Sequence, residues 1–428
     1  MTNETEMEKP AQNDLTPLNE KSRIVIVGAG LAGVRAAFSL REAGFTGSIL
    51  LLSDEEHLPY DRPPLSKAVL MKAGEESRIH LTRPEELAAA QIELRLGARC
   101  AALHPERRMI ALQGGDSIGY DRLVLATGSS VRTLADLPPG TDHVHYLRTL
   151  DDALRLRGAM ENARKVAIIG AGVIGLEAAA VLADGTRSVL VIDPADRVMA
   201  RAASPLLSNF LEDRHRAAGV DLRLGTHIAT IDRTADGPTF TLSDGHRFQA
   251  DLVLVGIGVI PNIALAEQAG LATAPTGIMV DSAGRTSDPF IYAAGEIAWH
   301  FNDRLGRHDR QETWAHAAAH GDHVGRMLID GHDPAYTEQS SYWTDQYDIA
   351  VQVFGTPIGE RDVVRGNRAE GSFLIFHLTG DEVIGVTSVN AARALRQGKK
   401  LLGQRITDLA ALADPGSDWA IVAKKAAA

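Results

Sequence analysis

A glycine-rich motif that occurs twice constrains this chain more than any other feature. The first copy, GAGLAG, spans residues 28–33, and the second, GAGVIG, spans residues 170–175, so the two begin 142 residues apart. Each copy follows an apolar run typical of a buried strand and precedes an Ala-rich run typical of a helix. Strand, GxGxxG and helix in this order are what a dinucleotide-binding βαβ unit requires. The repeat therefore predicts two such units in one chain.

Each glycine of the motif has a separate physical task. The first two permit a tight turn and the close approach of a pyrophosphate, and the third lets the helix pack on the strand. The helix N-terminus then offers free N–H groups to the phosphates. The predicted phosphate-binding glycines are Gly28, Gly30 and Gly33 in the first copy, and Gly170, Gly172 and Gly175 in the second.

An acidic residue follows the second strand of each predicted unit. Asp54 lies 21 residues past the last glycine of its motif, and Asp193 lies 18 residues past the last glycine of the other. A carboxylate at this place accepts hydrogen bonds from ribose hydroxyls, and Asp193 would repel the 2′-phosphate of NADPH. We therefore expect a resident flavin in one site and visiting NADH in the other, although Arg197 and Arg201 lie close enough to Asp193 to reduce that repulsion.

The single cysteine, Cys100, excludes several kinds of redox protein. A disulfide framework, a CxxC pair and a Cys-rich zinc or iron–sulfur site all need several thiolates. Any redox chemistry must then belong to a bound cofactor.

Net charge and hydropathy further narrow the class of protein to which this chain can belong. The net charge of −11 disfavours a nucleic-acid partner, and no apolar run approaches the length of a membrane span. Residues 1–20 carry five acidic residues against one lysine and lack the apolar stretch of a secretion signal. We expect a disordered acidic tail at 1–20 and a cytoplasmic protein of the α/β class, with no membrane association.

Several further segments carry a resemblance to a known family. They are LPYDRPPLSK at 58–67, YDRLVLATG at 120–128, YLRTLD at 146–151, GIGVIPN at 256–262, TSDP at 286–289, AGE at 294–296 and WTDQY at 343–347. Together with the two glycine motifs, they closely resemble the FAD-dependent ferredoxin reductases of Rieske-type aromatic-ring dioxygenase and cytochrome P450 systems. The resemblance covers roughly residues 22–395.

The resemblance implies the glutathione-reductase-like flavoprotein fold, with two Rossmann-like dinucleotide-binding domains and a C-terminal α+β interface domain. The FAD domain would comprise residues 21–123 and 263–332. The NAD domain, residues 124–262, would be inserted between these two segments, and the interface domain would span residues 333–428.

The same resemblance implies roles for individual residues. Lys67 matches a lysine beside flavin N5, where a fixed ammonium stabilises the charge that arrives with hydride, and Glu177 matches its carboxylate partner. Trp314 matches a catalytic-site tryptophan at the edge of the flavin ring and is predicted to open a helix. Glu296 stands where the family has an aspartate, and Cys100 matches a position that contacts adenine through its main chain.

The cofactor-binding positions can be carried over residue by residue. The FAD positions are Gly28, Gly30, Ala32, Gly33, Asp54, Arg62, Lys67, Cys100, Ala126, Thr127, Gly128, Arg148, Gly295, Glu296 and Trp314. The NADH positions are Gly170, Gly172, Val173, Ile174, Gly175, Glu177, Asp193, Arg201, Gly256, Ile257 and Gly258.

The activity implied is hydride transfer from NADH to FAD, followed by single-electron transfer to a [2Fe–2S] ferredoxin, plant-type or Rieske-type, that feeds an aromatic-ring-hydroxylating dioxygenase or a similar oxygenase. Related disulfide and peroxide reductases carry a redox-active cysteine soon after the first unit, where this chain has PPLSK at 63–67. Two alternatives stay open. One is rubredoxin, a quinone or oxygen as the acceptor, and the other is a redox switch resembling apoptosis-inducing factor. A monomer and a homodimer are both compatible with the sequence.

Three other features lie outside these motifs. His316, His320 and His323 have a spacing that imitates metal ligands, but we expect solvated histidines and no metal site. Trp343 is expected close to the flavin or in ordinary packing. Residues 383–407 contain no acid, and a helix there would place three cations on one face that could steer an acidic ferredoxin. These cations are Arg393, Arg396 and Lys400.

Overall fold

The computed structural model describes residues 17–302, 306–330 and 336–424. Of the predicted acidic tail, residues 1–16 lie outside this range. The chain divides into two compact units, each assembled from three separate stretches of sequence. Unit 1 comprises Met1–Asp61, His80–Ser129 and Pro261–Glu338, and unit 2 comprises Arg62–Ile79, Ser130–Ile260 and Gln339–Ala428. No helix in the described part of the chain is long and apolar enough to cross a membrane.

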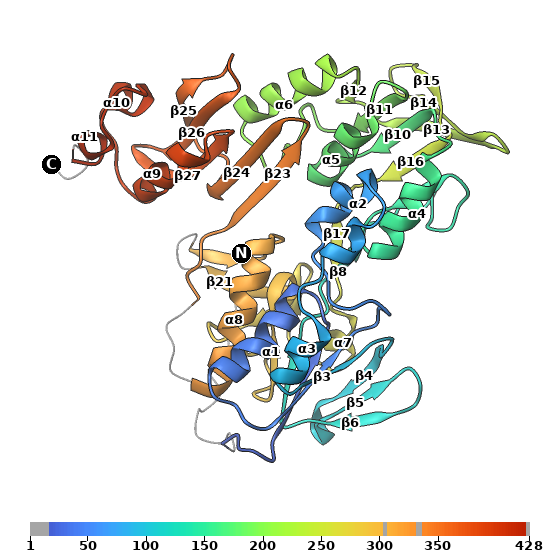
Figure 1. The fold of residues 1–428 in the computed structure, drawn as a ribbon, viewed down its shortest axis with the longest axis vertical. Helices are drawn as coiled ribbons and strands as arrows, with labels where there is room; N and C mark the ends of the chain where they lie inside the picture. The colour runs from blue at the N-terminus through green and yellow to red at the C-terminus, as the bar shows by residue number, and fades with distance from the viewer. Residues whose placement is uncertain (1–16, 303–305, 331–335, 425–428) are drawn as a thin grey trace, which may run out of the picture. The chain divides into compact units, whose positions relative to one another are not determined.

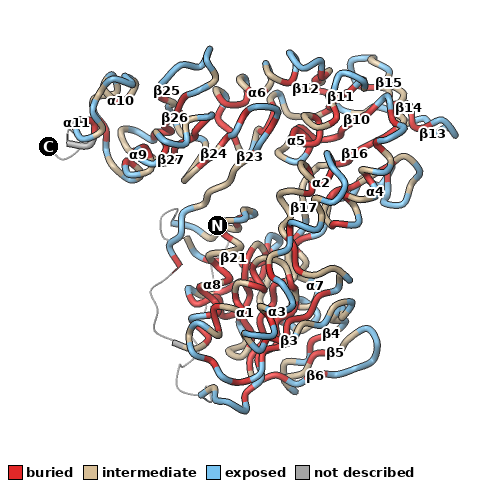
Figure 2. Tube along the Cα trace, viewed as in Figure 1, coloured by how far each residue is buried: buried red, intermediate tan, exposed pale blue. Residues whose placement is uncertain are grey.

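Unit 1 is built on a five-stranded parallel sheet with the strand order β20-β7-β1-β2-β3. Its strands are β1 (Arg23–Val27), β2 (Ser48–Leu52), β3 (Ile92–Arg95), β7 (Arg122–Leu125) and β20 (Ile291–Ala293). Ile24 and Ile26 face one hydrophobic core cluster, whereas Val25 and Val27 face another. Burial on both faces explains why the four residues that follow Arg23 in β1 are all apolar rather than alternating (Figure 2).

Helices cover one face of this sheet. They are α1 (Leu31–Glu42), α3 (Pro84–Ala89) and α8 (Trp314–Asp330). α1 and α8 lie side by side (Figure 1), and their approach depends on small residues. A Cβ atom at Gly321 would lie 2.4 Å from the Ala32 carbonyl oxygen, and one at Gly325 would lie 2.7 Å from the Ala36 oxygen. Larger residues at these two positions would force the helices apart.

The opposite face carries shorter elements. A three-stranded antiparallel sheet and α7 (Ala264–Gln268) supply much of the second core cluster. The strands of that sheet are β4 (Cys100–His104), β5 (Met109–Leu112) and β6 (Ser117–Gly119). A further sheet contains β18 (Thr273–Ala274), β19 (Gly277–Val280), β21 (Ala298–Asn302) and β22 (Arg307–Asp309).

Unit 2 repeats this plan in its parallel sheet, whose order is β12-β11-β10-β16-β9. The strands are β9 (Val144–Tyr146), β10 (Lys165–Ile169), β11 (Ser188–Asp193), β12 (Asp221–Leu224) and β16 (Leu252–Val255). Its helices are α4 (Leu150–Met160), α5 (Val173–Leu182) and α6 (Pro205–Ala217). A three-stranded antiparallel sheet again packs on one face, formed by β13 (Ile228–Thr234), β14 (Gly237–Leu242) and β15 (Arg247–Gln249). The repeat in the sequence is therefore a repeat of the whole sheet.

The C-terminal part of unit 2 is a five-stranded antiparallel sheet with helices. Its strands, in spatial order, are β23 (Ser341–Gln346), β24 (Ile349–Gly355), β27 (Glu382–Val389), β26 (Ser372–Thr379) and β25 (Arg361–Asn367). Its helices are α9 (Ala392–Gly398), α10 (Leu409–Ala413) and α11 (Trp419–Lys424). Phe210 of α6 meets Phe373 of β26 edge to face, with ring centroids 5.1 Å apart. The predicted class is confirmed: two Rossmann-like folds and a C-terminal α+β part.

Short elements complete the chain. They are the 3-10 turns η2 (Pro63–Ser66), η3 (Glu75–Arg78), η4 (Pro105–Arg107), η5 (Gly295–Ile297) and η6 (Lys399–Leu401), the helix α2 (Ala68–Met71), and the paired strands β8 (Ser129–Val131) and β17 (Val259–Pro261).

Candidate functional site

The first glycine turn joins β1 to α1 in unit 1. Gly28 has φ +112°, and a Cβ atom there would lie 2.1 Å from the carbonyl oxygen of Ala126. A Cβ atom at Gly33 would lie 1.9 Å from the Gly28 oxygen, so the third glycine lets the helix reach the strand. Gly30 has open space around it instead, directly before the first turn of α1. This is the shape that admits a phosphate to a helix N-terminus.

Other predicted flavin positions of unit 1 follow the carboxyl ends of the neighbouring strands. Asp54 follows β2, and its carboxylate is exposed. Ala126, Thr127 and Gly128 follow β7, and the Thr127 hydroxyl donates to the Asn262 carbonyl oxygen at 2.8 Å. Because parallel strands end at one edge of the sheet, these residues share the edge with the glycine turn.

Gly295 follows β20 at the same edge and packs on the start of α1. It has φ +78°, and a Cβ atom there would lie 2.6 Å from the Ala32 side chain. Glu296 comes next, half-buried in η5. The AGE segment therefore lies beside the first glycine turn.

Two buried histidines of α8 hold the main chain of Gly295. The Gly295 N–H donates to Nδ1 of His320 at 3.0 Å, and Nε2 of His316 donates to the Gly295 carbonyl oxygen at 3.3 Å. Burial lowers the pKa of His316 to about 3 and the pKa of His320 well below its ordinary value. The expectation of solvated histidines is therefore wrong, since His316, His320 and His323 are 1–4% exposed. Helical spacing shows which residues share a face, but it does not show what covers that face.

These histidines form a stacked cluster rather than a set of ligands. His316 and His320 stack at 5.0 Å, His300 stacks on both at 5.4 and 5.5 Å, and Tyr336 meets them edge to face. Within the described ranges, no group of His, Cys, Asp and Glu side chains could hold a metal ion.

Trp314 and Cys100 occupy two other predicted positions in unit 1. Trp314 is the first residue of α8, as predicted, and its indole N–H donates to Oδ1 of Asp61 at 2.6 Å. Cys100 begins β4, and the preceding segment runs beside the end of β2, where Ala98 N–H donates to the Ser53 oxygen at 2.6 Å. Burial raises the pKa of the Cys100 thiol to about 11, so this thiol is not a reactive nucleophile.

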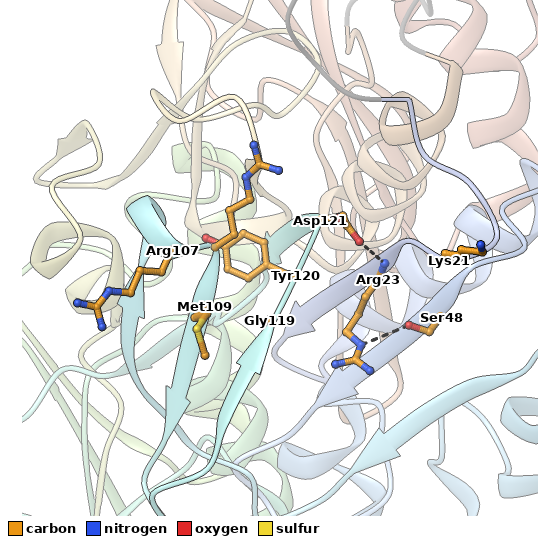
Figure 3. Close-up of a pocket in the computed structure, with 9 residues that line it drawn as sticks. Lys21, Arg23, Ser48, Arg107, Met109, Gly119, Tyr120 and Asp121 are labelled. Atoms are coloured by element: carbon orange, nitrogen blue, oxygen red, sulfur yellow. Dashed lines mark hydrogen bonds between the residues drawn. The ribbon is translucent and has the colours of Figure 1, made fainter.

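A basic depression lies at the other edge of the same sheet (Figure 3). It is lined by Arg23 at the start of β1, Ser48 at the start of β2 and Asp121 just before β7. Dinucleotides bind beyond the carboxyl ends of parallel strands, whereas these residues mark the amino ends. The depression is therefore separate from the predicted nucleotide site.

The second glycine turn, in unit 2, repeats the geometry of the first. Gly170 has φ +111°, and a Cβ atom there would lie 2.3 Å from the Gly256 oxygen. A Cβ atom at Gly175 would lie 2.0 Å from the Gly170 oxygen, while Gly172 again has open space around it. Val173 and Ile174 form the first turn of α5, and Ile174 is 40% exposed. Ile257 lies in the Gly256–Gly258 segment that faces this turn.

The acidic residue of the second unit is fixed by the main chain. Asp193 accepts hydrogen bonds from Ala171 N–H at 2.6 Å and Ala195 N–H at 2.8 Å. Arg201 lies near the Gly258 turn, with its Nη2 atom 3.5 Å from where a Cβ atom would stand. Arg197 instead donates to the Ala203 oxygen, the Ala200 oxygen and the Ser208 hydroxyl. Because the Arg197 guanidinium makes these three hydrogen bonds, it does not offset the negative charge of Asp193.

Lys67 and Glu177 meet in unit 2, although 110 residues separate them in the sequence. Two prolines begin η2, which ends directly before Lys67 and so fixes its backbone. The Lys67 ammonium lies 3.1 Å from Oε1 of Glu177 and 3.6 Å from Oδ2 of Asp345. It also lies 5.9 Å from the ring centre of Trp343. The side chains are 18% and 3% exposed for Lys67 and Glu177, so the pair is largely shielded from water.

Two hydroxyl groups complete the surroundings of this carboxylate. The Ser66 hydroxyl donates to Oε2 of Glu177, and the Thr344 hydroxyl donates to Oε1 at 2.8 Å. Neither Ser66 nor Thr344 is among the predicted site residues, although each stands beside one of the matched positions. Nearby in sequence, the Arg62 guanidinium donates to the Arg148 oxygen at 2.5 Å.

The predicted flavin positions thus divide between the units. Arg62, Lys67 and Arg148 belong to unit 2 together with every predicted NADH position, and the remaining flavin positions belong to unit 1.

Comparison with known proteins identifies the family. Residues 22–321 match the pyridine nucleotide-disulphide oxidoreductase family, and residues 341–422 match the reductase C-terminal family. The chain is 39% identical to the anthranilate 1,2-dioxygenase system ferredoxin–NAD(+) reductase component of Burkholderia cepacia, over 91% of this chain and 97% of the relative. It is 37% identical to putidaredoxin reductase of Pseudomonas putida, over 91% and 93% of the two chains.

A solved structure agrees in fold. The crystal structure of the ferredoxin reductase for the CYP199A2 system from Rhodopseudomonas palustris matches with a TM-score of 0.89 and 38% identity, over 94% of this chain and 100% of that one. This chain is therefore a member of the pyridine nucleotide-disulphide oxidoreductase family that carries a reductase C-terminal domain.

Proposed function

We propose that this protein is an NADH-dependent ferredoxin reductase. The observation that carries the proposal is the presence of two dinucleotide-binding turns in a chain with one cysteine. A family member that reduces its own disulfide needs two thiols, and Cys100 has no partner for that chemistry. Electrons taken from a nicotinamide must then leave for a separate acceptor, and the names of the relatives support a ferredoxin in that role.

FAD is the cofactor we assign to unit 1. When bound, it supplies the ability to accept a hydride from NADH and to release electrons one at a time. The residues fit this group, because Gly30 leaves open space at the start of α1 and Gly28 and Gly295 keep the backbone close. Asp54 is exposed where an adenosine ribose would need an acceptor. The proposed domains are 21–123 with 263–332 for FAD, 124–262 for NADH and 333–428 for the interface.

NADH is assigned to the second turn. Gly172 leaves room for the pyrophosphate before α5, and Asp193 presents a carboxylate where NADPH would bring a 2′-phosphate. With Arg197 committed elsewhere, Arg201 is the remaining cation of the two beside this site. These features support a preference for NADH.

Lys67 and Glu177 are the catalytic pair in this proposal. A fixed ammonium stabilises negative charge that arrives with the hydride, and it does so more strongly where water is excluded. Glu177 orients the ammonium through a 3.1 Å contact and is itself fixed by two hydroxyl groups. Trp314, at the start of α8, is proposed to border the flavin ring.

The partner proposed is a [2Fe–2S] ferredoxin, of the plant or Rieske type, that serves an aromatic-ring-hydroxylating dioxygenase or a similar oxygenase. Its docking face would include Arg393, Arg396 and Lys400, which are exposed on α9 and η6. The Lys399 ammonium instead lies 3.0 Å from the ring centre of Phe354, and burial lowers its pKa. Lys399 therefore belongs to the packing beneath the face.

The test is stopped-flow reduction of the flavin by NADH and by NADPH, followed by mixing with a [2Fe–2S] ferredoxin. We expect fast reduction by NADH and then reduction of the ferredoxin in single-electron steps. Direct reduction of a quinone, oxygen or rubredoxin with no ferredoxin reduction would overturn the assignment of the partner. Slow turnover with a long-lived complex of reduced flavin and NAD would favour a redox switch instead.

The docking face has its own experiment. The double variant Arg396→Glu, Lys400→Glu should weaken ferredoxin-coupled cytochrome c reduction and leave NADH–ferricyanide turnover intact. Arg107→Glu is the matched control, because it reverses the charge of an arginine in unit 1 whose side chain is 75% exposed, and it should change neither activity. Equal losses in both activities for the double variant would argue against docking at this face.

A further inference from the structure

A chain of hydrogen bonds leads from the Lys67–Glu177 pair into the core of unit 2. Thr344 donates to Oε1 of Glu177 at 2.8 Å, and the side-chain amide of Gln346 donates to the Thr344 hydroxyl at 3.1 Å. Beyond it, Nε2 of His215 lies 2.9 Å from Oε1 of Gln346. Thr344 and Gln346 are two residues apart on β23, so they lie on the same face of the strand. The chain thus connects α5, β23 and α6.

The inner links of this chain are shielded from water. Glu177, Thr344, Gln346 and His215 are 0–2% exposed. Only the outermost group reaches the surface, since Tyr347 is 36% exposed and its hydroxyl lies 3.0 Å from Nδ1 of His215. A buried polar chain of this kind is costly unless every member is satisfied, and here each member has a partner.

The direction of every hydrogen in the chain is fixed. Oε1 of Gln346 can only accept, so Nε2 of His215 must carry a hydrogen. Burial lowers the pKa of His215, which keeps the ring neutral and leaves Nδ1 to accept from Tyr347. The Thr344 hydroxyl receives a hydrogen from Gln346, so its own hydrogen goes to Glu177. All donors therefore point toward the carboxylate.

We propose that His215 is a positioning residue for the reductase reaction. It holds the Gln346 amide in one orientation, and through Thr344 it directs a hydrogen onto the Glu177 carboxylate that binds Lys67. Loss of the His215 donor would free the Gln346 amide to turn, and the Thr344 hydroxyl would no longer be held toward Glu177. The Lys67 ammonium would then be less firmly placed. The inference rests on the proposed function, because it assigns Lys67 a role in flavin reduction.

Two substitutions at His215 separate this role from simple packing. His215→Leu removes the Nε2 donor. His215→Gln carries an amide nitrogen at a similar distance from the backbone, so a hydrogen-bond donor remains at that place. We expect His215→Leu to slow flavin reduction by saturating NADH about tenfold, the change expected for one weakened charge-assisted hydrogen bond. The Kd for NADH should stay unchanged, and His215→Gln should restore most of the rate. A wild-type rate in His215→Leu, or a loss that His215→Gln does not rescue, would overturn the inference.

A double-mutant cycle gives a second test that does not depend on the stability of one variant. Thr344→Val removes the last link while keeping a similar shape. If His215 acts through Thr344, adding His215→Leu to Thr344→Val should slow flavin reduction no further. Additive effects on the rate would contradict the proposed chain.

Failure of the inference and failure of the proposed function are distinguishable. If NADH does not reduce the flavin of the unmodified protein, the proposed function fails whatever His215 does. If the unmodified protein is reduced and the His215 variants behave alike, only the positioning role fails.

Discussion

Replacing Lys67 with methionine leaves a carboxylate in the interior without its cation. The Glu177 side chain is 3% exposed, and after the substitution the side-chain donors that it keeps among the described residues are the Ser66 and Thr344 hydroxyl groups. Removing one partner of a buried pair costs about 3–5 kcal/mol, and we expect the lower end, about 3 kcal/mol, because Lys67 keeps some contact with water. Urea unfolding with a flavin-independent signal such as circular dichroism measures this loss.

The same substitution should slow the reaction. Removing one preorganised donor to developing charge lowers rates by about 100- to 1,000-fold, so we expect flavin reduction by NADH to slow at least about 100-fold in stopped flow. The Kd for NADH should change little, because the Gly170–Gly175 turn is untouched. Lys72→Met, at a side chain that is 72% exposed, is the matched control and should change neither rate nor stability.

A double variant separates the two effects. Lys67→Met with Glu177→Gln removes both charges, and a buried ion pair replaced by neutral groups costs little net stability. We expect the free energy of unfolding to return most of the way to its original value while the reduction rate stays low. The reasoning would be refuted if the double variant recovered the rate, or if Lys67→Met alone reduced its flavin at the original rate.

Four further outcomes follow from the geometry. In Gly33→Ala and Gly175→Ala the added methyl group would meet a carbonyl oxygen at 1.9–2.0 Å. Gly33→Ala should therefore abolish FAD retention, which flavin absorbance measures, whereas Gly175→Ala should keep the flavin but raise the Kd for NADH more than about tenfold in an NADH titration. Asp193→Ala should lower the ratio of kcat/KM for NADH over NADPH by at least about tenfold, measured in steady state. Burial lowers the pKa of His316 from 6.5 to about 3, so between these pH values the unfolded state binds more protons than the folded state, and the protein loses stability as the pH falls below 6.5. His316→Asn should reduce this loss by up to about 1.4 kcal/mol per pH unit, measured by urea unfolding at pH 6.5 and at pH 5. Cys100→Val should keep FAD and full turnover.

The sheets and their glycine turns could be predicted because their signals are local. β1 and β10 are apolar at nearly every position, since both faces of a parallel strand are covered. The first and third glycines of each motif stand where a Cβ atom would strike a carbonyl oxygen, and a motif of six residues is enough to reveal that. The parallel pairing of β1 with β2 and of β10 with β11 follows from the same βαβ units.

Contacts between distant segments could not be predicted from spacing. Lys67 and Glu177 are 110 residues apart, and their pairing was available only through the family resemblance. His215 lies 131 residues from Gln346, and although Gln346 stands in the WTDQY segment, no motif marks His215. The histidines of α8 carried a visible spacing, but burial against β21 decided their role, and burial depends on the whole fold.

The two copies of the nucleotide fold differ in charge and burial at one matched position. With a repeat of 142 residues, Glu177 of α5 corresponds to Arg35 of α1. Arg35 forms an ion pair with Asp322 of α8 at 2.6 Å, and its side chain is 42% exposed. Such a pair contributes at most about 1 kcal/mol and fastens two helices at the surface.

In the second copy the same position carries the opposite charge and lies in the interior. Glu177 is surrounded by an ammonium and two hydroxyl groups. Burying its charge costs desolvation free energy, which an apolar side chain of similar size at this position would not cost. The glycine turns are alike because both copies must admit a dinucleotide. In the proposed function the second copy must also hold a charge in place for chemistry, and on that proposal position 177 differs from position 35 for this reason. The Lys67 and His215 variants should then affect the rate far more than substitution of Arg35.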